Sequence, residues 1–151
     1  MINIAVTKGR IENSFYSTLL SKNIVGSIDS GLVLLVGFTH NDTINEVKKL
    51  ARKVVNLRIF DDENGVMNKS LLNIKGQILS ISQFTLYGDA SEGNRPSYVG
   101  AMKGEDAIKL YDLFNEELRS YGVEVQTGEF GADMDVRIEN DGPVTIWLES
   151  R

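Results

Sequence analysis

The sequence contains no cysteine, and its one histidine is His40. Without cysteine the chain has no disulfide bond, no thiolate nucleophile and no thiolate metal site. One imidazole cannot make a zinc site that needs two or more histidines. His40 lies beside Thr39, Asn41 and Asp42. This setting is typical of a polar loop rather than of a Ser-His-Asp triad. We therefore expect no metal, no cofactor and no histidine base.

The chain also lacks long apolar runs. No stretch reaches the eighteen or so apolar residues that a membrane helix needs, and no signal-peptide pattern begins the chain. These features predict a soluble, cytoplasmic protein that does not bind a membrane. With 151 residues and 42% hydrophobic content, we expect a single domain over residues 1–151, without repeats or linkers.

Positive charge is scarce as well, since the formal net charge is −5. This balance argues against broad binding of a phosphate backbone, so an RNA partner must be held by local basic groups. One such group is Lys48, Lys49, Arg52 and Lys53 on a predicted helix. A stripe of this kind is typical of a solvated helix face, and a contact with tRNA is the alternative. Further positive charge comes from Arg95, Lys103 and Lys109.

Hydrophobic periodicity predicts several strands and two helices. Leu32–Phe38 is a short apolar run bounded by glycine and indicates a buried strand. Thr43 and Glu46 form a capping box ahead of a helix to about Leu57. A second helix is expected from about Glu105 to Tyr121, and other strands at 77–81, 123–127, 134–138 and 144–149. This order favours a mixed α/β fold, with either a layered sheet or a barrel-like sheet.

The acidic segment Asp61–Gly65 is predicted to be a turn between two short extended pieces. Its carboxylates could suggest calcium binding. Their spacing does not match an EF-hand loop, which has ligands at alternate positions and glycine at the sixth. The segment therefore predicts a solvated turn rather than a metal site.

Two segments carry most of the functional information. Ser82-Gln83-Phe84-Thr85-Leu86 directly follows the strand at 77–81, where backbone N–H groups leave the sheet and can face a ligand. Asn140-Asp141-Gly142-Pro143-Val144-Thr145 contains a Gly-Pro step, which can hold an unusual backbone geometry such as a cis peptide. Each segment alone is compatible with a purely structural role.

Together, these segments resemble the two signature motifs of the D-aminoacyl-tRNA deacylase family. The similarity continues from residue 31 to the end of the chain, in the segments 31–37, 57–60, 67–68, 93–97 and 127–134. The chain departs from the family pattern at Val66, where lysine is usual, and at Gly104, where proline is common. It also departs at Thr7–Arg10, where the family has a short Gln-Arg-Val segment.

The resemblance implies a β-barrel-like sheet core with two main helices, assembled as a homodimer. It implies hydrolysis of the ester bond of D-aminoacyl-tRNA, and of glycyl-tRNA, with the tRNA 3′ end as partner. The family's site maps onto catalytic Ser82, Gln83 and Thr85, and onto substrate-binding Phe84, Ala101, Phe130, Met134, Gly142 and Pro143. In the family, the Gly-Pro step is a cis peptide that reaches into the partner subunit's pocket.

The expected chemistry does not need an ionisable side chain. Backbone N–H groups at the strand end can stabilise the developing oxyanion. Thr85 has no motif-linked base to activate it, so we favour attack by water, assisted by the 2′-hydroxyl of the substrate. Two alternatives remain: a non-catalytic nucleotide- or RNA-binding module on the same scaffold, and a domain that removes a wrongly attached L-amino acid.

Overall fold

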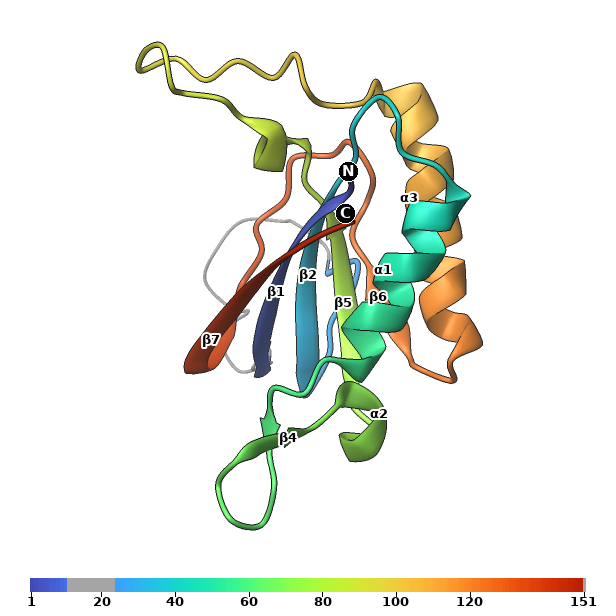
Figure 1. Ribbon diagram of the computed structural model, residues 1–151, viewed down its shortest axis with the longest axis vertical. Coiled ribbons are helices and arrows are strands. Elements are labelled where there is room, and N and C mark those ends of the chain that lie inside the picture. The colour runs from blue at the N-terminus through green and yellow to red at the C-terminus, as the bar shows by residue number, and fades with distance from the viewer. Residues whose placement is uncertain (11–23, 151) are drawn as a thin grey trace.

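The computed structural model describes residues 1–10 and 24–150, and its centre is a five-stranded mixed sheet (Figure 1). The strand order is β6-β5-β2-β1-β7. The bounds are β1 Asn3–Arg10, β2 Gly31–Gly37, β5 Gln77–Ser82, β6 Val125–Thr127 and β7 Glu139–Glu149. β1 runs antiparallel to both of its neighbours, whereas β2, β5 and β6 are mutually parallel. The mixed α/β class expected from the sequence is therefore confirmed.

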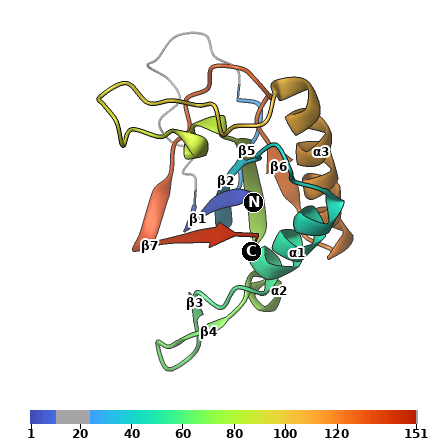
Figure 2. The same ribbon diagram turned by 45° about the horizontal axis from the view of Figure 1, so that its top comes forward.

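Two long helices cover one face of the sheet and lie side by side (Figures 1 and 2). α1 spans Ile44–Asn56 and begins at the predicted capping box: the Thr43 hydroxyl accepts from the Asn45 N–H, and the Glu46 carboxylate accepts from the Thr43 N–H. α3 spans Gly104–Ser120 and has two acidic residues in its first turn, which suit the positive end of the helix dipole. Both predicted helices are confirmed within two residues.

Alternation along the strands divides the apolar side chains into two clusters. The main cluster lies between the sheet and the helices and includes Ile4, Leu34, Ile78, Leu50 and Phe114. A smaller cluster on the other face, called here the second face, contains Ile28, Val33, Leu79 and Ile81.

The central strands β2 and β5 come unusually close at Gly31. A Cβ on Gly31 would lie 1.9 Å from the Gln77 carbonyl oxygen, and the φ of Gly31 is +150°. Only glycine permits the backbone of β2 to come so close to β5 at this point.

Smaller elements connect the large ones. The turn at Asp61–Gly65 joins two short strands as expected, β3 Phe60–Asp61 and β4 Met67–Lys69. The sequence did not predict the short helix α2, Leu71–Ile74, or the 3-10 helix η2, Phe84–Tyr87. In the described part of the chain, no helix is long and apolar enough to cross a membrane.

Two expectations about the sheet were wrong. Residues 134–138 form no strand, because Met134 and Val136 pack onto the second face without pairing to a neighbouring strand. Instead, β7 begins at Glu139 and is longer than the predicted 144–149. The barrel-like core is also not closed, since the edge strands β6 and β7 do not pair within the described residues.

Candidate active site

The first signature segment lies where β5 leaves the sheet. The Gln83 N–H donates to the Val36 carbonyl at 2.7 Å, which extends the ladder by one bond beyond Ser82. The chain then turns into η2, whose cap bond runs from the Leu86 N–H to the Gln83 carbonyl. The first N–H groups of a 3-10 helix have no acceptor within that helix. The N–H groups of Phe84 and Thr85 therefore stand at an open strand end.

The side chains of this segment differ in exposure. Ser82 and Gln83 are half-buried, whereas Phe84 and Thr85 are exposed. The Gln83 side-chain amide donates to the Thr85 hydroxyl. This bond orients Thr85 but does not activate it, because an amide cannot remove a proton from a hydroxyl.

An irregular loop between η2 and α3 borders the same strand end. Ala101 bridges to Thr39, and the Thr39 hydroxyl donates to the Gly100 carbonyl at 2.6 Å. The His40 ring nitrogen Nε2 lies 2.8 Å from the Val99 carbonyl oxygen. His40 thus helps to hold the loop, which is consistent with its predicted structural role.

Tyr98 is a site neighbour that the sequence did not single out. Its ring packs edge-on against Phe84 with a centroid distance of 5.2 Å, and both rings are partly open to solvent. It also comes close to Gly88, where an added Cβ would lie 3.0 Å from Tyr98 Cε1. The only sequence signal for the contact between Phe84 and Tyr98 is that both are aromatic residues near the same loop. Separation along a loop does not predict which side chains touch.

Phe130 and Met134 reach the two faces of the sheet. The Phe130 ring lies 5.6 Å from that of Tyr111 on α3, with the main cluster. Met134 packs against the second face and approaches Gly128 closely: a Cβ there would lie 2.5 Å from its sulfur. The two side chains, both predicted to bind substrate, therefore pack in different clusters, on either side of the β5 end.

Tyr111 connects α3 to the strand that carries the signature. Its hydroxyl donates to the Ser80 carbonyl at 2.7 Å in a buried setting, and the same carbonyl accepts from the Gly128 N–H at 3.3 Å. Burial raises the pKa of Tyr111 above its ordinary value. Burial likewise raises the pKa of Tyr87, at the end of η2. Both phenols are neutral at physiological pH.

The second signature segment forms a bulge in β7. The Gly142–Pro143 peptide is cis, as the resemblance implied, and Gly142 has φ +118°. The Asn140 side chain closes the bulge, since it accepts from the Val144 N–H and donates to the Thr145 hydroxyl, both at 3.1 Å. No pattern in the sequence predicted that Lys8 supports this bulge.

Lys8, on β1, supports the bulge in β7. Its side chain is largely buried, its ammonium lies 3.3 Å from the Asp141 carboxylate, and it lies 5.8 Å from the centre of the Phe60 ring. A buried lysine requires a charged or aromatic partner, and here it has both. It stands in the Thr7–Arg10 segment, where the chain departs from the family pattern.

The two signature segments lie at opposite ends of the sheet. Ser82 is level with Val36 and hence with Ile4 on β1, whereas the bulge flanks Thr7 and Gly9. The offset along the strands, together with three strand spacings across the sheet, separates the segments by roughly 20 Å. In Figure 1, η2 lies near the top of the sheet and the bend of β7 at the bottom. One chain therefore does not bring Gly142 and Pro143 to Ser82 and Thr85.

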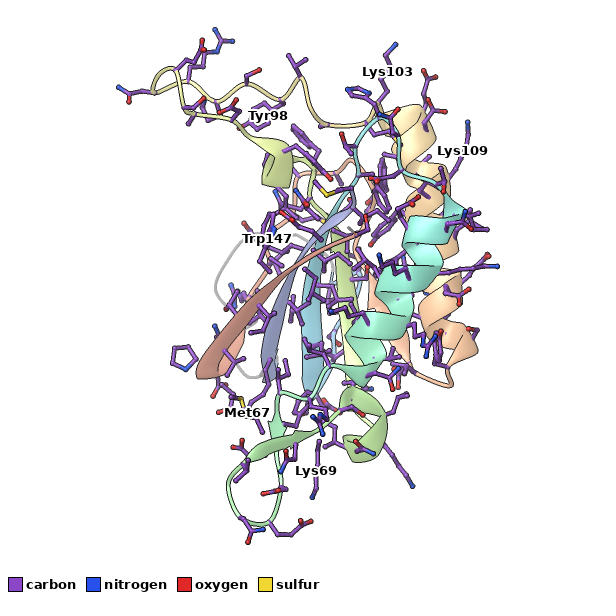
Figure 3. The ribbon with its side chains drawn as sticks, in the orientation of Figure 1. Met67, Lys69, Tyr98, Lys103, Lys109 and Trp147 are labelled. Carbon is purple, nitrogen blue, oxygen red and sulfur yellow. The ribbon has the colours of Figure 1, made fainter. Side chains whose placement is uncertain are left out.

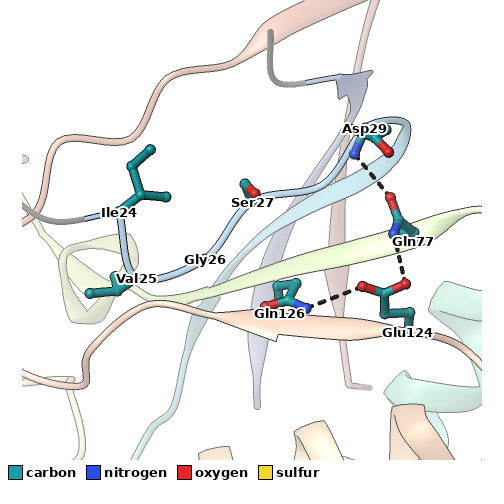
Figure 4. Close-up of a pocket in the computed structure, with 8 residues that line it drawn as sticks. All are labelled: Ile24, Val25, Gly26, Ser27, Asp29, Gln77, Glu124 and Gln126. Atoms are coloured by element: carbon teal, nitrogen blue, oxygen red, sulfur yellow. Dashed lines mark hydrogen bonds between the residues drawn. The ribbon is translucent and has the colours of Figure 1, made fainter. Parts of the chain in front are cut away.

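A separate cavity of about 400 Å³ lies at the other end of β5 (Figure 4). There the Gln77 side chain accepts from the Asp29 N–H and donates to Glu124, which also accepts from Gln126. These hydrogen bonds lower the pKa of Glu124, with the bond from Gln77 contributing most. The network joins the segment before β2 to the starts of β5 and β6, and it is distant from Ser82.

Comparison with known proteins decides the family. Residues 6–149 match the family described as D-Tyr-tRNA(Tyr) deacylase. The chain belongs to this family. It is 56% identical over 135 residues to a D-aminoacyl-tRNA deacylase of Bacillus cytotoxicus, covering 89% of this chain and 92% of the relative. The corresponding enzyme of Brevibacillus brevis is 57% identical over 134 residues, with the same coverage.

Two solved structures share the fold of this chain. A structure titled c-Myc DNA Unwinding Element Binding Protein has a TM-score of 0.81 and 36% identity, and it covers 100% of this chain and 99% of its own. A probable eukaryotic D-amino acid tRNA deacylase has a TM-score of 0.77 at 17% identity, covering 97% and 98%, which supports the fold alone.

Proposed function

We propose that this chain is a D-aminoacyl-tRNA deacylase, which hydrolyses the ester between a D-amino acid and the 3′-terminal ribose of tRNA. The carrying observation is the intact Ser82–Thr85 segment at an open strand end, in a chain that belongs to the deacylase family. The products are free D-amino acid and free tRNA. We take residues 1–151 as one domain that carries this activity.

The proposed reaction uses the backbone more than the side chains. The N–H groups of Phe84 and Thr85 face the carbonyl oxygen of the ester and stabilise its negative charge as water adds to the carbonyl carbon. The bond from that carbon to the ribose oxygen then breaks, and the ribose oxygen takes the proton. The substrate's 2′-hydroxyl assists this transfer, so Thr85 and Ser82 shape the pocket without forming a covalent bond to the substrate.

The remaining pocket contacts follow from the positions of the residues. Phe84 and Ala101 border the strand end on the loop side, whereas Phe130 and Met134 border it on either side of the sheet edge. We assign to these four side chains the binding of the terminal adenosine and the amino-acid side chain. No contact among the described residues assigns a metal to the site, and the proposed step does not use one.

A homodimer completes the site in this proposal. The roughly 20 Å separation within one chain leaves Gly142 and Pro143 free to enter the pocket of a second copy. The second face supports such an assembly, because Trp147 is 48% exposed there and Ala5 and Leu35 are only half-buried (Figure 3). An exposed tryptophan beside apolar strand residues is typical of a surface that another subunit covers.

Selectivity in this arrangement arises from exclusion. The two hands of an amino acid carry the same groups, so a site separates them through contacts around the α-carbon that only one hand permits. The carbonyl groups of Gly142 and Pro143 would meet the side chain of an L-amino acid, whereas a D-amino acid directs its side chain elsewhere. Glycine has no side chain to exclude, and we expect glycyl-tRNA to be hydrolysed as well.

A deacylation assay with matched D-tyrosyl-tRNA and L-tyrosyl-tRNA tests the function. We expect release of D-tyrosine well above the rate in buffer, with L-tyrosyl-tRNA close to that rate. Binding of tRNA without release of D-tyrosine would instead indicate the non-catalytic RNA-binding module. Faster release of L-tyrosine would instead indicate an editing domain that removes wrongly attached L-amino acids.

A further inference from the structure

The outward face of α1 carries an unusual concentration of positive charge. We define the α1 stripe as its four exposed basic residues, Lys48, Lys49, Arg52 and Lys53. At 3.6 residues per turn they occupy an arc of about 140°, centred opposite the buried face of the helix. The buried face is formed by Val47, Leu50, Ala51, Val54 and Val55. All four basic side chains therefore project into solvent.

Neighbouring groups do not neutralise the α1 stripe. The one acidic residue of α1, Glu46, is held by Thr43 in the capping box. None of the four basic residues takes part in an ion pair within residues 1–10 and 24–150. Lys48 and Arg52, and Lys49 and Lys53, are like charges at i,i+4, an arrangement that destabilises a helix. Only Lys53, in the last turn, suits the helix dipole, so helix stability does not account for the α1 stripe as a whole.

The positive charge of the α1 stripe contrasts with the negative charge of the chain as a whole and of the neighbouring helix α3. The net charge of the chain is −5, and the adjacent helix α3 has five acidic residues against two basic ones. One of those two, Lys109, is already paired with Asp106 at 3.0 Å. A polyanion that approaches the helical face is repelled by α3 and attracted by α1.

α1 begins at the end of the sheet that holds the proposed active site. α1 follows β2, whose carboxyl end is level with Ser82. The connecting residue Thr39 bridges to Ala101, so α1 begins at the end of the sheet where the site opens. The four residues begin one turn into the helix and extend over about one and a half further turns. Lys103, at the start of α3, adds an exposed charge at the same end (Figure 3).

We propose that the α1 stripe and Lys103 bind the phosphate backbone of the tRNA acceptor stem while the 3′ end occupies the Ser82–Thr85 site. This inference rests on the proposed function, which places the last nucleotide at that site. The stem must then lie across the surface next to the site. Proteins bind double-stranded RNA largely through its phosphates and 2′-hydroxyl groups, which a row of lysine and arginine side chains can contact.

Binding of uncharged tRNA tests this surface without any catalysis. We compare the double variant Lys49→Gln/Arg52→Gln with Lys69→Gln/Lys75→Gln, which loses the same charge at the other end of the sheet. Fluorescence anisotropy at several salt concentrations should show affinity about tenfold weaker for the α1 variant. The slope of log affinity against log salt should be smaller by about 1.5. The control should bind within twofold of the unmodified protein.

Kinetics separate this proposal from the proposed function. For the α1 variant, we expect KM for D-tyrosyl-tRNA to rise with little change in kcat. Hydrolysis of D-tyrosine esterified to adenosine alone should not change, because this substrate has no stem. If the unmodified protein binds tRNA through the α1 stripe but releases no D-tyrosine, the proposed function fails and the surface stands. If both double variants bind tRNA with equal affinity and equal salt slope, the proposal is overturned.

Discussion

Replacing Tyr111 by phenylalanine removes one buried hydrogen bond without changing the shape of the core. The Tyr111 hydroxyl donates to the Ser80 carbonyl at 2.7 Å, two residues before the signature segment. A bond between neutral groups contributes about 0.5–1.5 kcal/mol to folding. The Ser80 carbonyl keeps its bond from the Gly128 N–H, so it is not left without a partner, and the buried Asn115 side chain loses its contact with the hydroxyl. We therefore expect the free energy of unfolding to fall by about 1 kcal/mol.

Thermal and chemical unfolding can measure this change. For a chain of this size, 1 kcal/mol lowers Tm by about 2–4 °C. Tyr121→Phe is the matched control, because it removes the same atom at the end of the same helix, where the side chain is only half-buried. We expect the control to change Tm by less than half as much. Equal shifts in the two variants would show that the Ser80 bond contributes nothing specific.

The pH dependence provides a second test of the same bond. Burial raises the pKa of Tyr111 in the folded protein, so the unfolded chain ionises first, near pH 10. The contribution of the neutral phenol is complete below that pH and decreases as the pH rises further. Tyr111→Phe should therefore make the alkaline loss of stability less steep. Tyr87, whose pKa is also raised, should maintain part of the slope in both proteins.

Three further predictions concern catalysis. The Thr85→Ala variant should retain substantial turnover of D-tyrosyl-tRNA, because the only described side-chain partner of Thr85 is the Gln83 amide. A covalent acyl group trapped on Thr85 would contradict direct attack by water. A chain with no cysteine and one histidine should keep its activity in EDTA, measured with tRNA folded in advance; recovery only upon adding a divalent ion would disprove this. Gly142→Leu should lose activity toward D-tyrosyl-tRNA and glycyl-tRNA alike, since a Cβ at this φ of +118° would lie 2.7 Å from Val144 Cγ2; full activity of a folded variant would refute it.

Features that depend on local chemistry could be predicted from the sequence. The start of α1 was predictable because Thr43 and Glu46 bond to each other across one turn. The alternation of Val144, Ile146 and Leu148 predicted the face that β7 buries. The absence of a strand at 134–138 was not predictable, because apolar alternation looks the same whether a segment pairs with a neighbour or only packs on a sheet.

Some features of the candidate site could also be predicted from the sequence, and others could not. The position of Ser82 at a strand end follows from the apolar run before it, and the strand in the structure ends at this residue. The separation of Ser82 from Gly142 depends on strand order and direction, which hydrophobic periodicity does not determine. The contact between Phe84 and Tyr98 depends on the path of a long loop.

Placing the two signature segments at opposite ends of one sheet has a genetic consequence under the proposed dimer. Each chain gives its pocket to one site and its Gly142–Pro143 segment to the other. A chain defective in Gly142 and a chain defective in the pocket would together form one intact site, so the mixture would recover activity that neither has alone. A normal chain paired with either defective chain would keep one site of two, so the mixed dimer would have half the activity of a normal dimer.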